Sequence, residues 1–227
     1  MMFNKRKFSD IDFSYCTKKK KIEKKDENEE KHNIEDSIPL ILGKNKSDTK
    51  IDREYNHIYF HSEVTRESIF DLTMLIKEAE EECVLSCLKL NIDEIPIYLH
   101  INSYGGSIFA GFTAIDVINA CRVPIYTIVE GAVASAGTLM SIVGKKRYIR
   151  PNAYMLVHQL SSSCWGKMNE IEDEYNNLKD LMERIKDIYK NHTSIPKKEL
   201  NEILKHDLWF NSDKCLKNGL ADEIWEK

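Results

Sequence analysis

The chain has few features that would indicate a metal site or a disulfide framework. Its six cysteines include no CxxC pair, and several lie inside apolar runs, which favours reduced thiols over disulfides. Cys83 and Cys87 stand one helical turn apart, but no His/Cys pair with zinc-like spacing accompanies them. We therefore interpret these two residues as packing thiols and expect no metal site.

The chain also lacks long apolar runs and a nucleotide-binding loop. No apolar run reaches membrane-spanning length, and the first residues contain no hydrophobic signal core. Gly144-Lys145 is followed by Lys146, and Leu139 stands where the P-loop pattern requires its first glycine. We expect a soluble, cytoplasmic protein that is not secreted, has no membrane partner and uses no cofactor.

Positive charge is concentrated at the N-terminus. Residues 1–25 hold nine Lys/Arg and three Asp/Glu, although the whole chain has a net charge of −4. Residues 1–50 are too polar to offset the entropy of ordering, so we predict a disordered charged tail there and one domain over 51–227. A nuclear-localisation, nucleic-acid-binding or organelle-targeting signal is the alternative, but the acidic run Glu27–Glu30 favours a solvated tail without a nucleic-acid partner. The apolar island Ile38–Leu42 would dock onto the body or a partner.

The predicted domain alternates between strand-like and helix-like segments. Several strands are apolar almost throughout, which is typical of parallel strands buried on both faces. Open α/β sheets place their sites beyond the carboxyl ends of such strands. In chain order we expect the strand His57–Phe60, a helix capped by Thr65, the strand Ile95–Ile101, the helix Ala110–Ala120, the strand Ile125–Val129, a helix opening at Thr138–Val143, the strands Arg147–Ile149 and Tyr154–His158, and the helices Met168–His192 and Glu199–Lys205.

Ser135 is the only functional group in the run of small residues Gly131–Gly137. The run follows an apolar strand and precedes an apolar helix, so Ser135 would lie on a strand-to-helix turn. An anionic intermediate there would be near the positive end of the helix and near amides without intrahelical partners. Taken alone, a serine in this position is more often a helix cap. Partners from elsewhere in the chain must therefore decide its role.

A base and a carboxylate follow Ser135 in the chain. His158 can take a proton near neutral pH, and Asp207 can fix the tautomer of its imidazole. Asp213 and Asp222 are alternatives to Asp207. An α/β-hydrolase is disfavoured, because its residues run in the order Ser, Asp/Glu, His and its nucleophile lies in a GxSxG elbow.

Gly105 and Gly106 follow the strand Ile95–Ile101. Glycine lets an amide N–H point into a site with no side chain in the way. One amide from this pair and one beside Ser135 would form an oxyanion hole.

Five segments together resemble the family of Clp protease proteolytic subunits, which has the ClpP/crotonase fold. The resemblance implies an α/β fold of repeated β-β-α units with a long handle helix, here Met168–His192. It rests on Ile97–Gly111, Glu130–Leu139, Arg147–Gln159, Asp207–Ser212 and Asn218–Asp222.

The same resemblance implies a serine endopeptidase. In it Ser135 is the nucleophile, His158 the general base and Asp207 the orienting acid. The backbone N–H groups of Gly106 and Ala136 form the oxyanion hole. The residues that would bind an extended peptide by strand addition are Gly105, Ser107, Ile108, Phe109, Leu160 and Ser161.

The implied partners are polypeptide substrates, further copies of the chain and an AAA+ unfoldase of the Clp ATPase type. The copies would form heptameric rings stacked into a tetradecamer. Tyr104 stands where the family usually has proline, and Leu160 replaces a second proline, so we expect a substrate groove of different shape. The alternatives are a non-catalytic ring subunit, a crotonase-like acyl-CoA enzyme, and Ser–Lys catalysis through Lys145 or Lys146.

Overall fold

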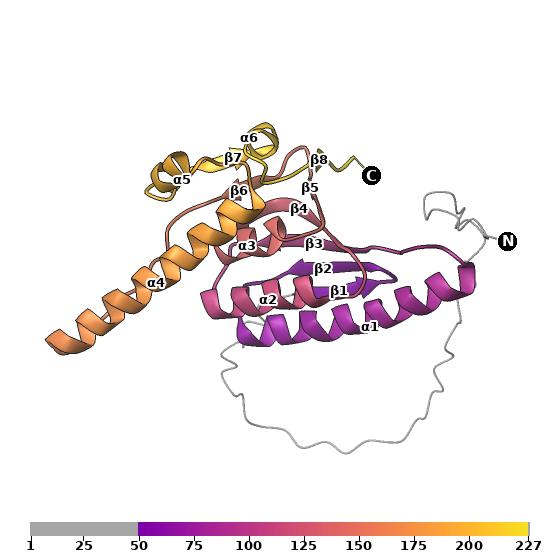
Figure 1. Cartoon of the computed structure of the whole chain (residues 1–227), viewed down its shortest axis with the longest axis horizontal. Helices are drawn as coiled ribbons and strands as arrows, with labels where there is room; N and C mark the ends of the chain where they lie inside the picture. Colours follow the sequence, from indigo (N-terminus) through magenta and orange to yellow (C-terminus); the bar gives the residue numbers. More distant parts are fainter. Residues whose placement is uncertain (1–49, 227) are drawn as a thin grey trace, which may run out of the picture.

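An eight-stranded mixed sheet organises residues 50–226, the part of the chain that the computed structural model describes (Figure 1). Residues 1–49 of the predicted tail, including the island Ile38–Leu42, lie outside these residues, and Lys50 begins strand β1. The main sheet has the order β1-β2-β3-β4-β5-β8, while β6 pairs with β4 and β7 pairs with β6. The strands are β1 (Lys50–Glu54), β2 (His57–His61), β3 (Ile97–Ser103), β4 (Ile125–Ala134), β5 (Lys146–Ile149), β6 (Tyr154–Leu156), β7 (Trp209–Asn211) and β8 (Glu223–Ile224).

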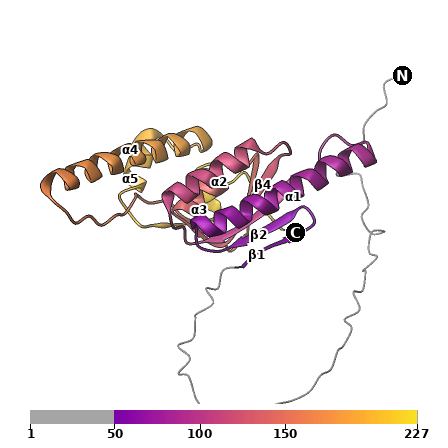
Figure 2. The ribbon, with the colours of Figure 1, turned by 90° about the horizontal axis from the view of Figure 1, so that it is seen from below.

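The longest helices lie beside the sheet and beyond it. Figures 1 and 2 show α1 and α2 side by side along the sheet, whereas α4 projects away from the rest of the chain. Among residues 50–226, no helix is both long enough and apolar enough to cross a membrane. The helices are α1 (Arg66–Leu90), α2 (Ile108–Ala120), α3 (Ala136–Ile142), α4 (Met168–His192), α5 (Lys197–Ile203) and α6 (Ser212–Lys217).

Helix α1 begins where the sequence predicted, at a cap formed by Thr65. The Ser68 amide donates to Thr65 Oγ1 at 3.1 Å, and the Thr65 amide donates to Ser68 Oγ at 2.9 Å, a reciprocal capping box. Asn91 ends the helix with φ of 52°, the left-handed conformation that stops helices. The apolar side chains of α1 that are buried in the core are Ile69, Leu72, Ile76, Ala79 and Cys83.

Strand β3 is a central parallel strand, which confirms the prediction from its apolar sequence. It pairs in parallel with β2 on one side and with β4 on the other. Ile97, Leu99 and Ile101 alternate along it and are completely buried. The intervening side chains form an aromatic layer on the opposite face, where Tyr98 stacks on His57 with ring centres 4.7 Å apart.

Strand β4 is longer than predicted and changes partner along its length. Residues up to Val129 pair with β5, while Ala132–Ala134 pair with β6. Gly131 lies between the two pairings with φ of 57°, a conformation that glycine adopts without strain. Most of the predicted small-residue turn is therefore strand, and only Ser135 separates β4 from α3.

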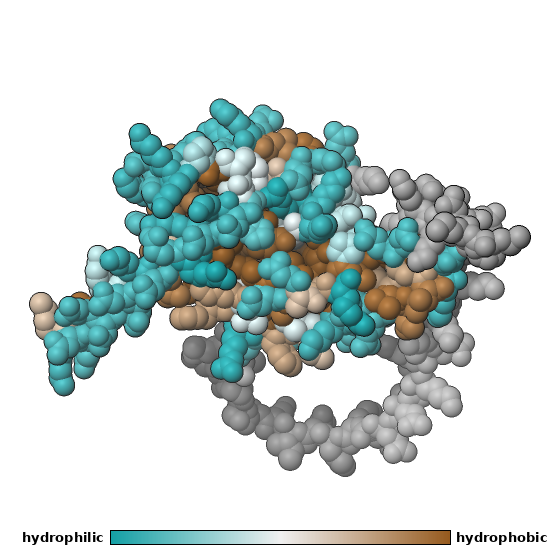
Figure 3. All heavy atoms as spheres, in the orientation of Figure 1, coloured by the Kyte–Doolittle hydropathy of each residue, from teal (hydrophilic) through white to brown (hydrophobic). Residues whose placement is uncertain are grey.

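Helix α4 has the predicted bounds but is buried only near its C-terminus. Ile185 and Tyr189 lie in the core, whereas Ile171 and Tyr175 on the same stripe are exposed. Trp165, just before the helix, is also exposed. Figure 3 shows a hydrophilic surface along most of the visible face of α4. The exposed apolar stripe is thus confined to the projecting half of the helix.

Candidate active site

Three neighbouring strands bring Ser135, His158 and Asp207 to the same end of the sheet. Ala134 in β4 pairs with Leu156 in β6, and Leu156 pairs with Trp209 in β7. Ser135 comes one residue after this row, and His158 comes two residues after it. Asp207 comes two residues before Trp209. Because β7 runs antiparallel to β6, the residues before β7 lie at the same end of the sheet as the residues after β6.

Ser135 has a backbone conformation that is unusual for a residue other than glycine. Its φ is 54° and its ψ is −126°, and such a conformation costs about 1–3 kcal/mol unless the surroundings impose it. The Ser135 amide donates to Leu156 O at 3.2 Å, and Thr138 N donates to Ser135 O at 3.0 Å. The side chain makes no capping hydrogen bond to α3. The helix-cap interpretation of Ser135 is therefore wrong, and its hydroxyl is left for another role.

His158 contacts the carboxylate that the sequence favoured. Its Nδ1 lies 3.3 Å from Asp207 Oδ1, with the imidazole 22% exposed and the carboxylate 79% exposed. This contact leaves Nε2 as the nitrogen able to serve Ser135. His158 lies two residues beyond β6 rather than on its last residue, because β6 loses its pairing after Leu156.

Ser135 and His158 line one small cavity of about 20 Å³. Gly106, Ala136, Ile108 and Leu160 line it too. Within the described residues, the Ser135 hydroxyl makes no hydrogen bond to His158. The two side chains are thus gathered around a common space without a direct hydrogen bond between them.

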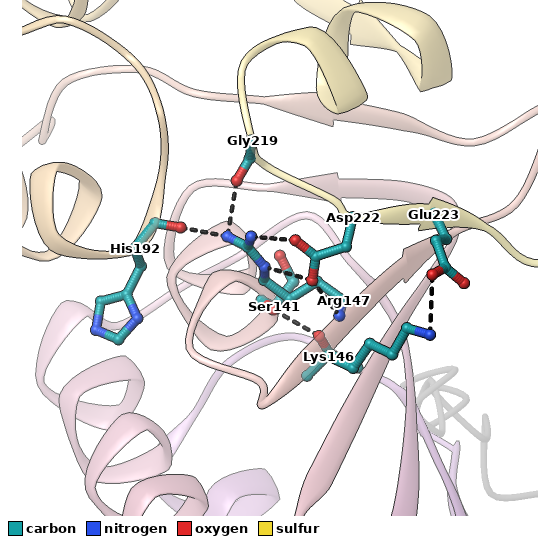
Figure 4. Close-up of polar contacts among 8 residues, drawn as sticks. Ser141, Lys146, Arg147, His192, Gly219, Asp222 and Glu223 are labelled. Atoms are coloured by element: carbon teal, nitrogen blue, oxygen red, sulfur yellow. Dashed lines mark hydrogen bonds and ion pairs between the residues drawn. The ribbon is translucent and has the colours of Figure 1, made fainter.

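The competing carboxylate Asp222 is held elsewhere. Arg147 Nε donates to Asp222 Oδ2 at 3.0 Å, and Arg147 N donates to the same oxygen at 2.9 Å. Burial alone would raise the pKa of Asp222, but the hydrogen bonds from Arg147 outweigh it and lower that pKa. Figure 4 shows the Arg147 guanidinium between this carboxylate and the carbonyl groups of His192 and Gly219. Arg147 therefore joins the end of α4 to the C-terminal segment, and Asp222 is held by this arginine.

Two backbone amides border the same cavity. Gly105 O accepts from Val64 N at 2.7 Å, and Ser107 N donates to Val64 O at 2.8 Å. Val64 thus forms a parallel β-bridge with Gly106, the residue between Gly105 and Ser107. In this bridge the N–H of Gly106 points away from Val64. The N–H of Ala136 is the first of α3 and has no partner within the helix.

The predicted peptide-binding residues divide between two surfaces. Ile108 and Leu160 line the cavity beside Ser135, and Gly105 packs against Ser135 itself. Ser107 and Phe109 line a different, larger groove between α1 and α2. Neighbouring residues on a helix point about 100° apart, which sends Phe109 away from Ile108. Ser161 is exposed.

Two residues at the site had no chemical role in the sequence interpretation. The hydroxyl of Tyr189 in α4 hydrogen-bonds with Thr138 Oγ1 in α3, and Tyr189 also lines the cavity with Ser135. A tyrosine within a stripe of core residues was the available signal, because a buried phenol requires a polar partner. Residues 50–226 contain no group of three or more His, Cys, Asp or Glu side chains placed to hold a metal ion.

Comparison with known proteins gives matches to Clp proteases. The family model described as Clp protease matches residues 52–227. ATP-dependent Clp protease proteolytic subunit 2 of Treponema denticola is 33% identical over 131 residues, and the corresponding subunit of Deinococcus radiodurans is 29% identical over 133 residues. The alignments cover 57% and 58% of this chain and just under two thirds, 66% and 65%, of these relatives.

A solved structure shares the fold. A mutant of ClpP1 from Listeria monocytogenes superimposes with a TM-score of 0.65 at 24% identity, covering 76% of this chain and 92% of that chain. The predicted fold class, an α/β ClpP-type fold with a long handle helix, is therefore confirmed.

Proposed function

The chain belongs to the Clp protease family, and we propose that it is a serine-type endopeptidase acting through Ser135, His158 and Asp207. The observation that carries the proposal is the pairing of Ala134, Leu156 and Trp209 across β4, β6 and β7. Each proposed catalytic residue lies within two residues of this row, although the three come from distant parts of the sequence. Asp207 beside His158 Nδ1 supports the same assignment.

In the proposed reaction Ser135 Oγ attacks the carbonyl carbon of a peptide bond. His158 Nε2 accepts the hydroxyl proton, and Asp207 stabilises the imidazolium that results. The negative charge that develops on the substrate oxygen is met by the amides of Gly106 and Ala136. His158 returns the proton to the leaving amine, and water then releases the acyl group from Ser135.

The same proposal extends to assembly and partners. The exposed residues Ile171 and Tyr175 on α4 support contact with further copies of the chain, because single soluble chains rarely expose such a stripe. Heptameric rings stacked through α4 are the proposed form. The names of the two relatives describe ATP-dependent proteases, and the P-loop pattern is absent from this sequence. An AAA+ unfoldase would therefore deliver folded substrates.

Hydrolysis of a fluorogenic peptide by the purified protein tests this function. Wild-type protein should cleave the peptide without ATP or a partner, and His158→Ala should lower the rate by several orders of magnitude at unchanged native mass. A non-catalytic ring subunit would assemble yet cleave nothing. Equal rates for wild type and His158→Ala would refute the catalytic assignment.

A further inference from the structure

A buried chain of hydrogen bonds joins α4 to the backbone of Ser135. The phenol oxygen of Tyr189 contacts Thr138 Oγ1, and Thr138 Oγ1 lies 2.6 Å from Ser135 O. Tyr189 is 1% exposed and Thr138 is completely buried, so water does not compete for these groups. In so dry an environment each hydroxyl proton must have an acceptor.

The direction of the chain follows from counting protons. Each hydroxyl has a single proton to donate. Thr138 Oγ1 is the acceptor that the described residues offer to Tyr189, so Tyr189 donates to Thr138. Thr138 then uses its own proton on the carbonyl oxygen of Ser135. Burial raises the pKa of Tyr189, so the phenol keeps this proton throughout the working pH range.

The carbonyl that receives this chain belongs to the same peptide group as the N–H of Ala136. The peptide group is planar and trans, so an orientation imposed on Ser135 O is imposed on the Ala136 N–H as well. Ser135 O accepts from both Thr138 Oγ1, at 2.6 Å, and Thr138 N, at 3.0 Å. Hydrogen bonds to a carbonyl also polarise its peptide group and strengthen the N–H as a donor.

We propose that Tyr189 and Thr138 are positioning residues that aim and polarise the Ala136 amide toward the oxyanion of the reaction. The inference rests on the proposed roles of Ser135 and Ala136. It makes the last turn of α4 part of the catalytic apparatus through its hydrogen bond to Thr138. The Arg147 side chain, which donates to His192 O, fixes the same end of α4 three residues after Tyr189.

Thr127 in strand β4, which hydrogen-bonds to the same helix α3, provides a matched control. Thr127 is also completely buried, and its Oγ1 donates to Ser141 O in α3 at 2.6 Å. Thr127→Val thus removes a hydroxyl-to-carbonyl hydrogen bond to α3, as Thr138→Val does. It does so at the C-terminal end of the helix, away from Ser135.

The experiment compares Thr138→Val, Tyr189→Phe, Thr138→Ser and Thr127→Val with wild type, measuring kcat, KM and inhibition by a peptide boronate. A boronate forms a tetrahedral adduct on a nucleophilic serine and presents an oxygen to the oxyanion hole. Because a lost oxyanion donor costs about 100-fold or more, a misdirected one should cost less, and we expect kcat to fall about tenfold in Thr138→Val and Tyr189→Phe. Boronate affinity should fall equally, while KM stays within about twofold of wild type.

Thr138→Ser should retain wild-type kcat, since it keeps the hydroxyl, and Thr127→Val should retain it as well. The inference would be overturned if Thr138→Val and Tyr189→Phe had the same kcat as Thr127→Val. Tyr189→Phe keeps the ring and decides the question if Thr138→Val does not fold. A wild-type protein that cleaves no peptide would refute the proposed function itself. An active wild type whose Thr138→Val and Tyr189→Phe variants have unchanged kcat would refute the positioning role alone.

Discussion

A Cβ atom on Gly105 would lie 2.6 Å from the Cβ of Ser135, closer than two such carbons can approach. The same atom would lie 2.8 Å from Ala134 O, and Gly105 has a φ of 94°. The glycine loop and the proposed nucleophile are therefore packed against each other with no space for a side chain between them. This packing is one of the contacts that surround the unusual backbone conformation of Ser135.

Gly105→Ala should abolish most of the peptide hydrolysis. The added methyl must displace Ser135 or the loop, and misplacement of a catalytic group by about 1 Å costs roughly 100-fold in rate. The control is Gly166→Ala, whose Cβ would meet only the side chain of Glu170. Steady-state kinetics of the two variants check the prediction, which fails if Gly105→Ala is as active as Gly166→Ala.

Asp207→Asn and Asp222→Asn should have opposite effects. Asp207 is exposed and contacts His158, so its loss should cut kcat severely with little change in stability. Asp222 instead pairs with Arg147, so its loss should leave chemistry intact and lower the free energy of unfolding by about 1–3 kcal/mol. Urea unfolding and peptide hydrolysis, measured on both variants, separate the two roles. The reverse ranking would contradict the assignment of Asp207.

The sequence predicted most of the scaffold because its signals are local. The apolar run of β3 and the Thr65 cap each depend on residues within one segment, and both were correct. The extension of β4 to Ala134 was missed because it depends on pairing with β6, which no local pattern encodes. The hydrogen bond between Thr138 and Tyr189 spans 51 residues and was missed for the same reason.

The sequence was enough to predict which strand ends carry the candidate site. Ser135 and His158 follow apolar strands, so their gathering at one edge followed from the order of elements. The resemblance placed Phe109 with Ile108 among the peptide-binding residues, and in the structure the two line different surfaces. Side-chain direction on a helix depends on its packing, which the resemblance to a family does not specify.

His57 should make stability fall as the solution is acidified from pH 7 to pH 5. Burial first, and the proximity of His100 second, lower the pKa of His57 from 6.5 to about 4. The unfolded chain therefore binds a proton in this window that the folded chain does not, and folding loses stability as pH falls. Glu130 stays ionised throughout, because its hydrogen bond with His100 contributes most to lowering its pKa to about 2.

Urea unfolding at the two pH values checks this effect in His57→Gln and in the exposed control His206→Gln. Wild type should lose on the order of 1 kcal/mol more than His57→Gln, a value reduced from that of a fully buried group because His57 is partly solvated. The control should follow wild type. A His57→Gln protein with the wild-type pH dependence would show that His57 is protonated in the folded state.

Tyr175→Asp should disrupt assembly without unfolding the chain. Tyr175 lies on the exposed apolar stripe of α4, and a charge buried in a contact between copies has no partner there. Asp173→Asn, on the opposite side of the same exposed turn, is the matched control. Native mass spectrometry should show a smaller assembly for Tyr175→Asp only, and an unchanged mass would exclude this stripe as the contact.

The most direct measurement of the central claim is the intact mass of the protein after treatment with a fluorophosphonate probe, followed by peptide mapping. Wild-type protein should gain one adduct on Ser135, and His158→Ala should gain it far more slowly. Ser135→Ala should gain none and should lose peptide hydrolysis by about 10⁴-fold or more. An adduct on another residue, or near-wild-type hydrolysis by Ser135→Ala, would contradict the assignment of Ser135 as the nucleophile.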